Sequence, residues 1–67
     1  MGAKPSGFVM FMLLSGAPLL VRPESVTAVY VRFDDDGEWV TVVKVGDSEE
    51  GEFCVKETEK RVMEILS

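Results

Sequence analysis

The first third of the chain carries an almost unbroken apolar run, with hydrophobic residues at both of the alternating positions of a strand. No polar residue occurs between Phe8 and Leu14, and Ser15-Gly16-Ala17-Pro18 separates this run from a second short segment at 19–22, which is apolar up to Arg22. Gly and Pro at such a position indicate a turn. The pattern predicts two strands, at 8–14 and 19–22, and the first is apolar on both faces.

The same run also has features of a signal peptide. Lys4, the apolar residues 8–14 and the small residues 15–17 imitate its three parts. Cleavage after Ala17 would, however, place Pro18 at the scissile bond and leave only about 50 residues. A membrane-spanning helix needs roughly 20 apolar residues, and Gly16 and Pro18 interrupt the run too early. We therefore favour the strand pair and expect no membrane association.

Regular alternation begins after Pro23-Glu24-Ser25 and predicts two further strands, at 26–33 and 38–45. Asp34-Asp35-Asp36-Gly37 lies between them and is typical of a hairpin loop, because Asp and Gly favour the required turn geometry. In the strand at 26–33, the expected faces are Thr27/Val29/Val31/Phe33 and Val26/Ala28/Tyr30/Arg32.

The hydrophobic period changes from two to about 3.6 residues near the C-terminus. A polar loop at 46–51 and a short strand at 52–56 precede this change. Val62, Ile65 and Leu66 then recur at helical spacing, which predicts a helix over 59–66. Thr58 is the expected N-cap. The order of elements predicts an α+β fold: a small antiparallel β-sheet of about five strands with one C-terminal helix.

The length of 67 residues limits the chain to one domain, which we place at 8–67 after a flexible tail at 1–7. So small a domain usually needs a disulfide, a metal or a partner subunit for stability. With one cysteine and no histidine, neither an internal disulfide nor a Cys/His zinc site is available. We expect a homo-oligomer formed through the first strand, whose interface residues are Phe8, Met10, Phe11, Met12 and Leu13.

Charge narrows the range of partners. The net charge is −5, and 8 of the 12 acidic residues lie between Asp34 and Glu52. Nucleic-acid binding depends on Lys and Arg neutralising phosphates, so we do not expect a nucleic-acid partner. The lone Cys54 suits a reducing compartment, and we expect a cytoplasmic protein.

Few residues of the chain are candidates for catalysis or metal binding. The acidic run at 34–38 lacks the alternating ligands of a calcium loop, Glu49, Glu50 and Glu52 lie in a polar loop, and Cys54 has no histidine to activate it. We therefore expect no catalytic residue, no metal site, no cofactor and no enzymatic activity. The alternative hypothesis is a ligand site between subunits, in which basic and aromatic side chains could clamp and stack on a small anion. Its residues would be Arg22, Arg32, Trp39 and Tyr30.

Two stretches resemble the short flagellar and swarming-motility proteins and their prophage look-alikes. The first, LLSGAPLLVRPESVTAVYV, has a Gly-x-Pro turn followed by V-x-P-E-x-V, and the second, FCVKETEKRVMEIL, has V-K-E-T followed by helical spacing. The matching residues, within about 9–66, are Gly16, Pro18, Val21, Pro23, Glu24, Val26, Val29, Val55, Lys56, Glu57, Thr58, Val62 and Ile65. The resemblance implies a small bacterial or phage protein with a non-enzymatic accessory role.

The functional hypothesis is accordingly a homo-oligomeric protein-interaction module that contacts itself and another protein. Two alternatives remain. A phage counter-defence protein could sequester a small anionic ligand, such as a signalling nucleotide, at a subunit interface, using the basic and aromatic residues named above. An acidic nucleic-acid mimic would instead present the loops at 34–38 and 46–52 side by side.

Overall fold

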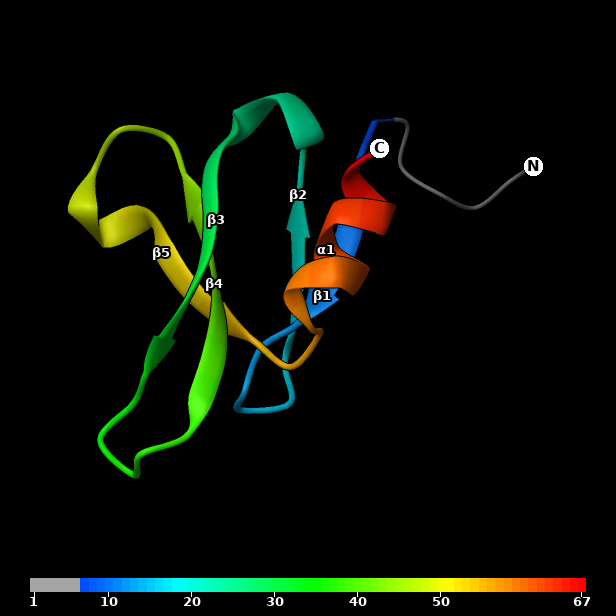
Figure 1. Cartoon of the computed structure of the whole chain (residues 1–67). Helices are drawn as coiled ribbons and strands as arrows, with labels where there is room; N and C mark the ends of the chain where they lie inside the picture. The colour runs from blue at the N-terminus through cyan, green and yellow to red at the C-terminus, as the bar shows by residue number, and fades with distance from the viewer. Residues whose placement is uncertain (1–6) are drawn as a thin grey trace.

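The computed structural model describes residues 7–67, so nearly all of the predicted N-terminal tail lies outside the described residues. Within this part, the chain forms β1 (Val9–Met12), β2 (Pro18–Val21), η1 (Pro23–Ser25), β3 (Val26–Phe33), β4 (Trp39–Val45), η2 (Glu49–Gly51), β5 (Glu52–Val55) and α1 (Glu59–Leu66). Figure 1 shows how the strands are arranged, with α1 beside them. The predicted α+β class, with five strands and a C-terminal helix, is confirmed.

The five strands form two antiparallel sheets that meet at one point. β1 and β2 form a hairpin, and β3, β4 and β5 form a meander. A single bridge between Leu13 and Val55 joins the end of β1 to β5. The backbone N–H of Lys56 donates to the carbonyl of Met12 at 2.8 Å, and that of Leu14 donates to the carbonyl of Cys54 at 3.2 Å. The strands therefore follow one another in space as β2-β1-β5-β4-β3.

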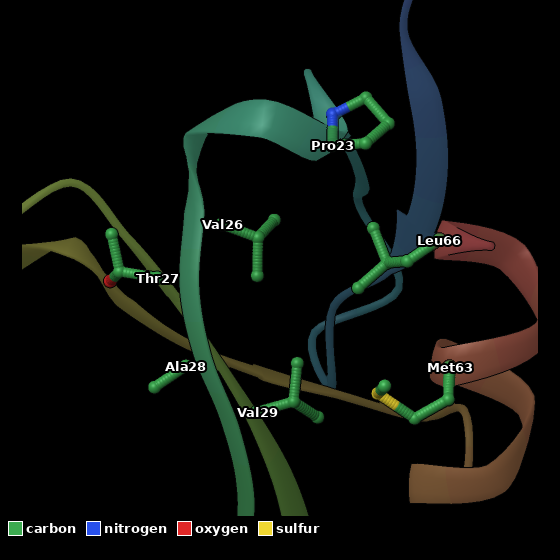
Figure 2. Close-up of a pocket in the computed structure, with 7 residues that line it drawn as sticks. All are labelled: Pro23, Val26, Thr27, Ala28, Val29, Met63 and Leu66. Atoms are coloured by element: carbon green, nitrogen blue, oxygen red, sulfur yellow. The ribbon is translucent and has the colours of Figure 1, made fainter.

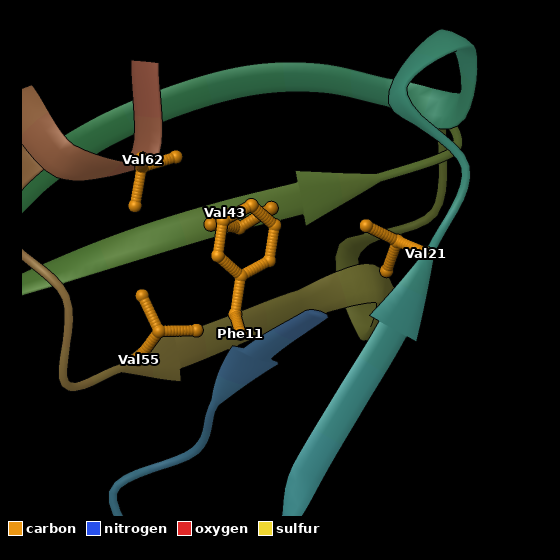
Figure 3. Packing of buried hydrophobic residues seen from close by; sticks show 5 residues of the cluster. All are labelled: Phe11, Val21, Val43, Val55 and Val62. Carbon is orange, nitrogen blue, oxygen red and sulfur yellow. The ribbon is translucent and has the colours of Figure 1, made fainter. Parts of the chain in front are cut away.

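The core lies where the hairpin, the meander and the helix meet. Figure 3 shows its five buried side chains, which come from five different elements. They are Phe11, Val21, Val43, Val55 and Val62. The single aromatic ring of Phe11 occupies the centre and is fully buried. The core is thus small and consists mainly of valine, as expected for strands rich in β-branched residues.

The helix begins and ends where the sequence predicts. The Thr58 hydroxyl accepts a hydrogen bond from the backbone N–H of Arg61, which is the N-cap arrangement. Val62 is fully buried, and Ile65 and Leu66 pack against the core cluster. An eight-residue helix is marginal by itself, so this apolar face is what holds α1 on the strands.

One predicted pair of strand faces is wrong because β3 contains a bulge. Val26 pairs with Val45, but Ala28 pairs with Lys44, so Thr27 is an extra residue in the ladder. Its hydroxyl donates to the carbonyl of Gly46 at 2.8 Å. A bulge reverses the alternation of faces. Val26 consequently packs against the core cluster, as Val29 does, and does not share the face of Ala28 and Tyr30.

The first strand is shorter than predicted. It spans four residues, followed by the bridging Leu13 and a tight turn in which Gly16 has a φ of 98°. One face of β1 is covered within the chain, because Phe11 is fully buried, whereas Met10 on the other face is 53% exposed.

Candidate interaction surface

The outer face of the β1–β2 hairpin is apolar and open. Met10 pairs with Leu20, and Met12 pairs with Pro18, so the register places these four side chains on one face. Met10 is 53% and Leu20 is 52% exposed. We call these four residues the hairpin patch. Phe8 precedes β1 at one end of the patch, where the Arg22 guanidinium lies 5.2 Å from its ring centroid.

The predicted interface residues fall into two groups. Met10 and Met12 belong to the hairpin patch, and Phe8 lies half-buried next to it. Phe11 is fully buried and Leu13 packs against the core cluster. Phe11 and Leu13 therefore contribute to the packing of the single chain. The two groups lie on opposite faces of the strand because its side chains alternate. The sequence did not reveal this division, because both faces carry apolar residues.

Glu57 is a structural residue that sequence reasoning missed. Both of its carboxylate oxygens accept from the backbone N–H of Met12, at 3.1 and 3.2 Å. This N–H points away from β2, beyond the end of the β1–β5 pairing. The side chain therefore continues the attachment of the hairpin to the remainder of the fold. The V-K-E-T stretch contains this glutamate, but nothing in the pattern indicates its acceptor role.

A second apolar surface lies at the far end of the meander. The rings of Phe33 and Trp39 are stacked, with centroids 3.9 Å apart and an interplanar angle of 30°. Phe33 is 58% exposed, Trp39 is 64% exposed and Val31 is 41% exposed. These three residues lie on the same face as Val43, but beyond the end of the core. We call them the aromatic end.

A pocket of about 290 Å³ lies between β3 and α1. Figure 2 shows Val26 and Val29 of β3 facing Met63 and Leu66 of α1, with Pro23 above them. Its lining side chains are apolar apart from that of Thr27. The pocket is lined by none of the four residues predicted for an anionic ligand.

Those four residues do not converge within one chain. Tyr30 and Arg32 share a face of β3, but Trp39 pairs with Phe33 and lies on the opposite face. Arg22 lies before η1, beside Phe8 and 3.9 Å from the Glu24 carboxylate. A shared anion site would therefore need residues from more than one copy.

Tyr30 and Arg32 interact with β5 across the outer face of the meander. Glu52 raises the pKa of the Tyr30 phenol, chiefly by accepting its hydrogen bond, with smaller contributions from burial and from the negative charge. The Arg32 guanidinium lies 3.9 Å from the Cys54 sulfur, and this contact raises the pKa of Arg32. Both shifts favour the uncharged phenol and the charged guanidinium on this face.

The acidic loops lie at opposite ends of β4. In the loop at 34–38, the Asp34 carboxylate accepts from the backbone N–H groups of Asp36 and Glu38, both at 2.9 Å. Asp34 therefore stabilises the hairpin turn, as the predicted Asx-type geometry requires. The second loop begins after Val45, about 20 Å away along the strand. Among the side chains that the structure describes, no group of three acidic or cysteine residues is placed to hold a metal ion.

Comparison with models of known protein families, with curated proteins and with solved structures finds no match. No helix in the described part of the chain is long and apolar enough to cross a membrane. The fold and the surface together define a small, β-rich α+β protein with an exposed apolar hairpin face. The resemblance to short motility proteins and their prophage look-alikes stays a prediction.

Proposed function

We propose that this chain is a non-enzymatic accessory protein that acts as a homo-oligomeric protein-interaction module. The observation that carries the proposal is the hairpin patch, in which Met10 and Leu20 form an exposed apolar pair. Contiguous apolar surface of this kind on a small protein marks an interaction site. The patch occupies a regular two-stranded element, so it is preformed before a partner binds.

The composition of the patch suits association. Methionine is flexible and polarisable, and it adapts to partner surfaces of different shape. Covering the exposed halves of Met10 and Leu20 contributes roughly 1 kcal/mol for each side chain. Two copies that bring the same patch together gain this contribution twice, because a two-fold interface uses identical surfaces.

The test is Met10→Glu, measured by native mass spectrometry and by light scattering coupled to size exclusion. The variant keeps the core intact because Met10 lies on the outer face, and it introduces a charge that is costly to bury in an interface. We expect a folded protein of lower mass in solution than the wild type.

Lys60→Gln is the matched control. It changes the net charge by the same single unit, at an exposed position in the first turn of α1. It should leave the mass in solution unchanged. A Met10→Glu variant with the mass of the wild type would contradict the proposal.

A further inference from the structure

One long edge of the meander is unpaired. β3 pairs only with β4 in the described part of the chain, although it is an eight-residue strand. The backbone N–H of Asp34 donates to the carbonyl of Glu38 on the β4 side. Because successive residues of a strand point their backbone groups in opposite directions, the N–H and C=O groups of Val29, Val31 and Phe33 point to the free edge. An edge of this kind is a template for an added strand.

The edge has apolar features at both of its ends. At one end, Val29 lines the pocket with Met63. At the other end, Phe33 and Trp39 form the exposed aromatic end. The bulge at Thr27 ends the regular part of the edge. Val29, Val31 and Phe33 are therefore the residues that a partner strand can pair with in regular antiparallel register.

We infer that the free edge of β3 pairs with β3 of a second copy, in a two-fold antiparallel arrangement centred on Val31. This register uses all three free pairs of backbone groups. Val31 then faces Val31 of the second copy, and Phe33 faces Val29. The pocket beside Val29 leaves room for the aromatic ring of the second copy, and the same contact occurs twice.

The polar face of β3 is complementary in the same register. Arg32 faces Tyr30 of the second copy, where the guanidinium can lie against the aromatic ring. Asp34 faces Ala28 of the second copy. Lys44 of that copy is the β4 partner of Ala28, so only the small alanine side chain stands between the carboxylate and the lysine. A register shifted by one pair toward the hairpin loop sets Arg32 opposite Arg32, and like charges directly opposite each other are destabilising. Charge complementarity thus favours the register centred on Val31.

This inference shares with the proposed function only the premise that the chain associates with itself. The β3 contact uses a different surface from the hairpin patch. A two-fold contact at the hairpin patch and another at β3 are both self-complementary. Together they generate either a closed assembly with an even number of subunits or an open chain.

The first test is disulfide trapping in a Cys54→Ser background, which removes the natural thiol. Val31→Cys should give a covalent dimer on mild oxidation, because directly opposed residues lie within the Cα separation that a disulfide spans. Val29→Cys is the control and should not cross-link to itself, because it faces Phe33. Absence of the Val31→Cys dimer, or equal cross-linking of the two variants, would overturn the inference.

The second test is Val31→Pro, compared with Val31→Thr by native mass spectrometry. The backbone N–H of Val31 points away from β4, so proline removes a donor from the free edge alone. We expect the mass of the Val31→Pro variant to fall at least twofold, and that of Val31→Thr to stay unchanged. A Val31→Pro variant that circular dichroism shows to be folded, with unchanged mass, would overturn the inference. If the variant is unfolded, the cross-linking result decides.

The two variants distinguish the proposed hairpin interface from the inferred β3 interface. If Met10→Glu lowers the mass and Val31→Pro does not, the hairpin interface stands and the β3 inference is wrong. The reverse result retains the β3 interface and removes the hairpin from the proposed function. The double variant should be monomeric if both interfaces exist.

Discussion

At the scale of single residues, neighbouring side chains in β1 have opposite roles. Phe11 is fully buried and occupies the centre of the core, whereas Met10 is 53% exposed. Their side chains point to opposite faces because strand side chains alternate. Removing the ring of Phe11 leaves a cavity that a core of small valines cannot fill.

We expect Phe11→Ala to lower the free energy of unfolding by about 3–5 kcal/mol, since that is the cost of truncating a buried phenylalanine. So large a loss removes much of the stability of a domain of this size. Met10→Ala should cost less than about 1 kcal/mol when the chain is dissociated. Urea denaturation at low protein concentration measures both values. Equal losses for the two variants would show that Phe11 is not the centre of the core.

At the scale of elements, few hydrogen bonds attach the hairpin to the meander. A single bridge at Leu13–Val55 and the Glu57 carboxylate at Met12 connect β1 to the segment that contains β5. A hairpin alone is marginally stable in water. The hydrogen bonds to Glu57 therefore limit how often the end of β1 separates from the segment that contains β5.

We expect Glu57→Ala to reduce protection of the Met12 amide from hydrogen exchange and to lower the free energy of unfolding by about 1.5–3 kcal/mol, as for other hydrogen bonds to charged groups. Glu57→Gln retains an acceptor oxygen and should lose less. Exchange followed by nuclear magnetic resonance reports the Met12 amide directly. If Glu57→Ala left that amide as protected as in the wild type, the role assigned to Glu57 would be wrong.

At the scale of the whole molecule, exposed apolar side chains gather in two places. The hairpin patch and the aromatic end lie on different elements, and each contains side chains more than half exposed. The core has a single aromatic ring and no disulfide. The proposed association through either surface would add the stabilisation that so small a core lacks.

We expect the melting temperature to rise with protein concentration, because an assembly that binds only folded chains is stabilised by mass action. About a hundredfold more protein adds about 2.7 kcal/mol when a partner binds with a single dissociation constant. For a domain of this length, that corresponds to a rise on the order of 10 °C. Differential scanning calorimetry over a dilution series makes the measurement. A melting temperature that is independent of concentration would contradict self-association.

Local patterns were sufficient to predict most of the elements. Alternation and turn residues predicted the strands to within a few residues, and helical spacing with Thr58 predicted α1 to the residue. These features depend on neighbours in the chain, through backbone geometry and capping. The α+β class follows from their order. The need for a partner was likewise inferred from the length and from the absence of other stabilising groups.

Tertiary contacts decided the rest. The bulge at Thr27 moved Val26 to the core face, and packing buried the face of β1 that carries Phe11 and left the face with Met10 exposed. The Glu57 carboxylate accepts from the backbone N–H of Met12, which lies 45 residues away along the chain. The aromatic end and the pocket lie at different points along β3, whose outer edge pairs with no strand in the described part of the chain. Each depends on which segments meet in space, because an apolar residue is equally suited to a core and to an interface, and only packing distinguishes the two.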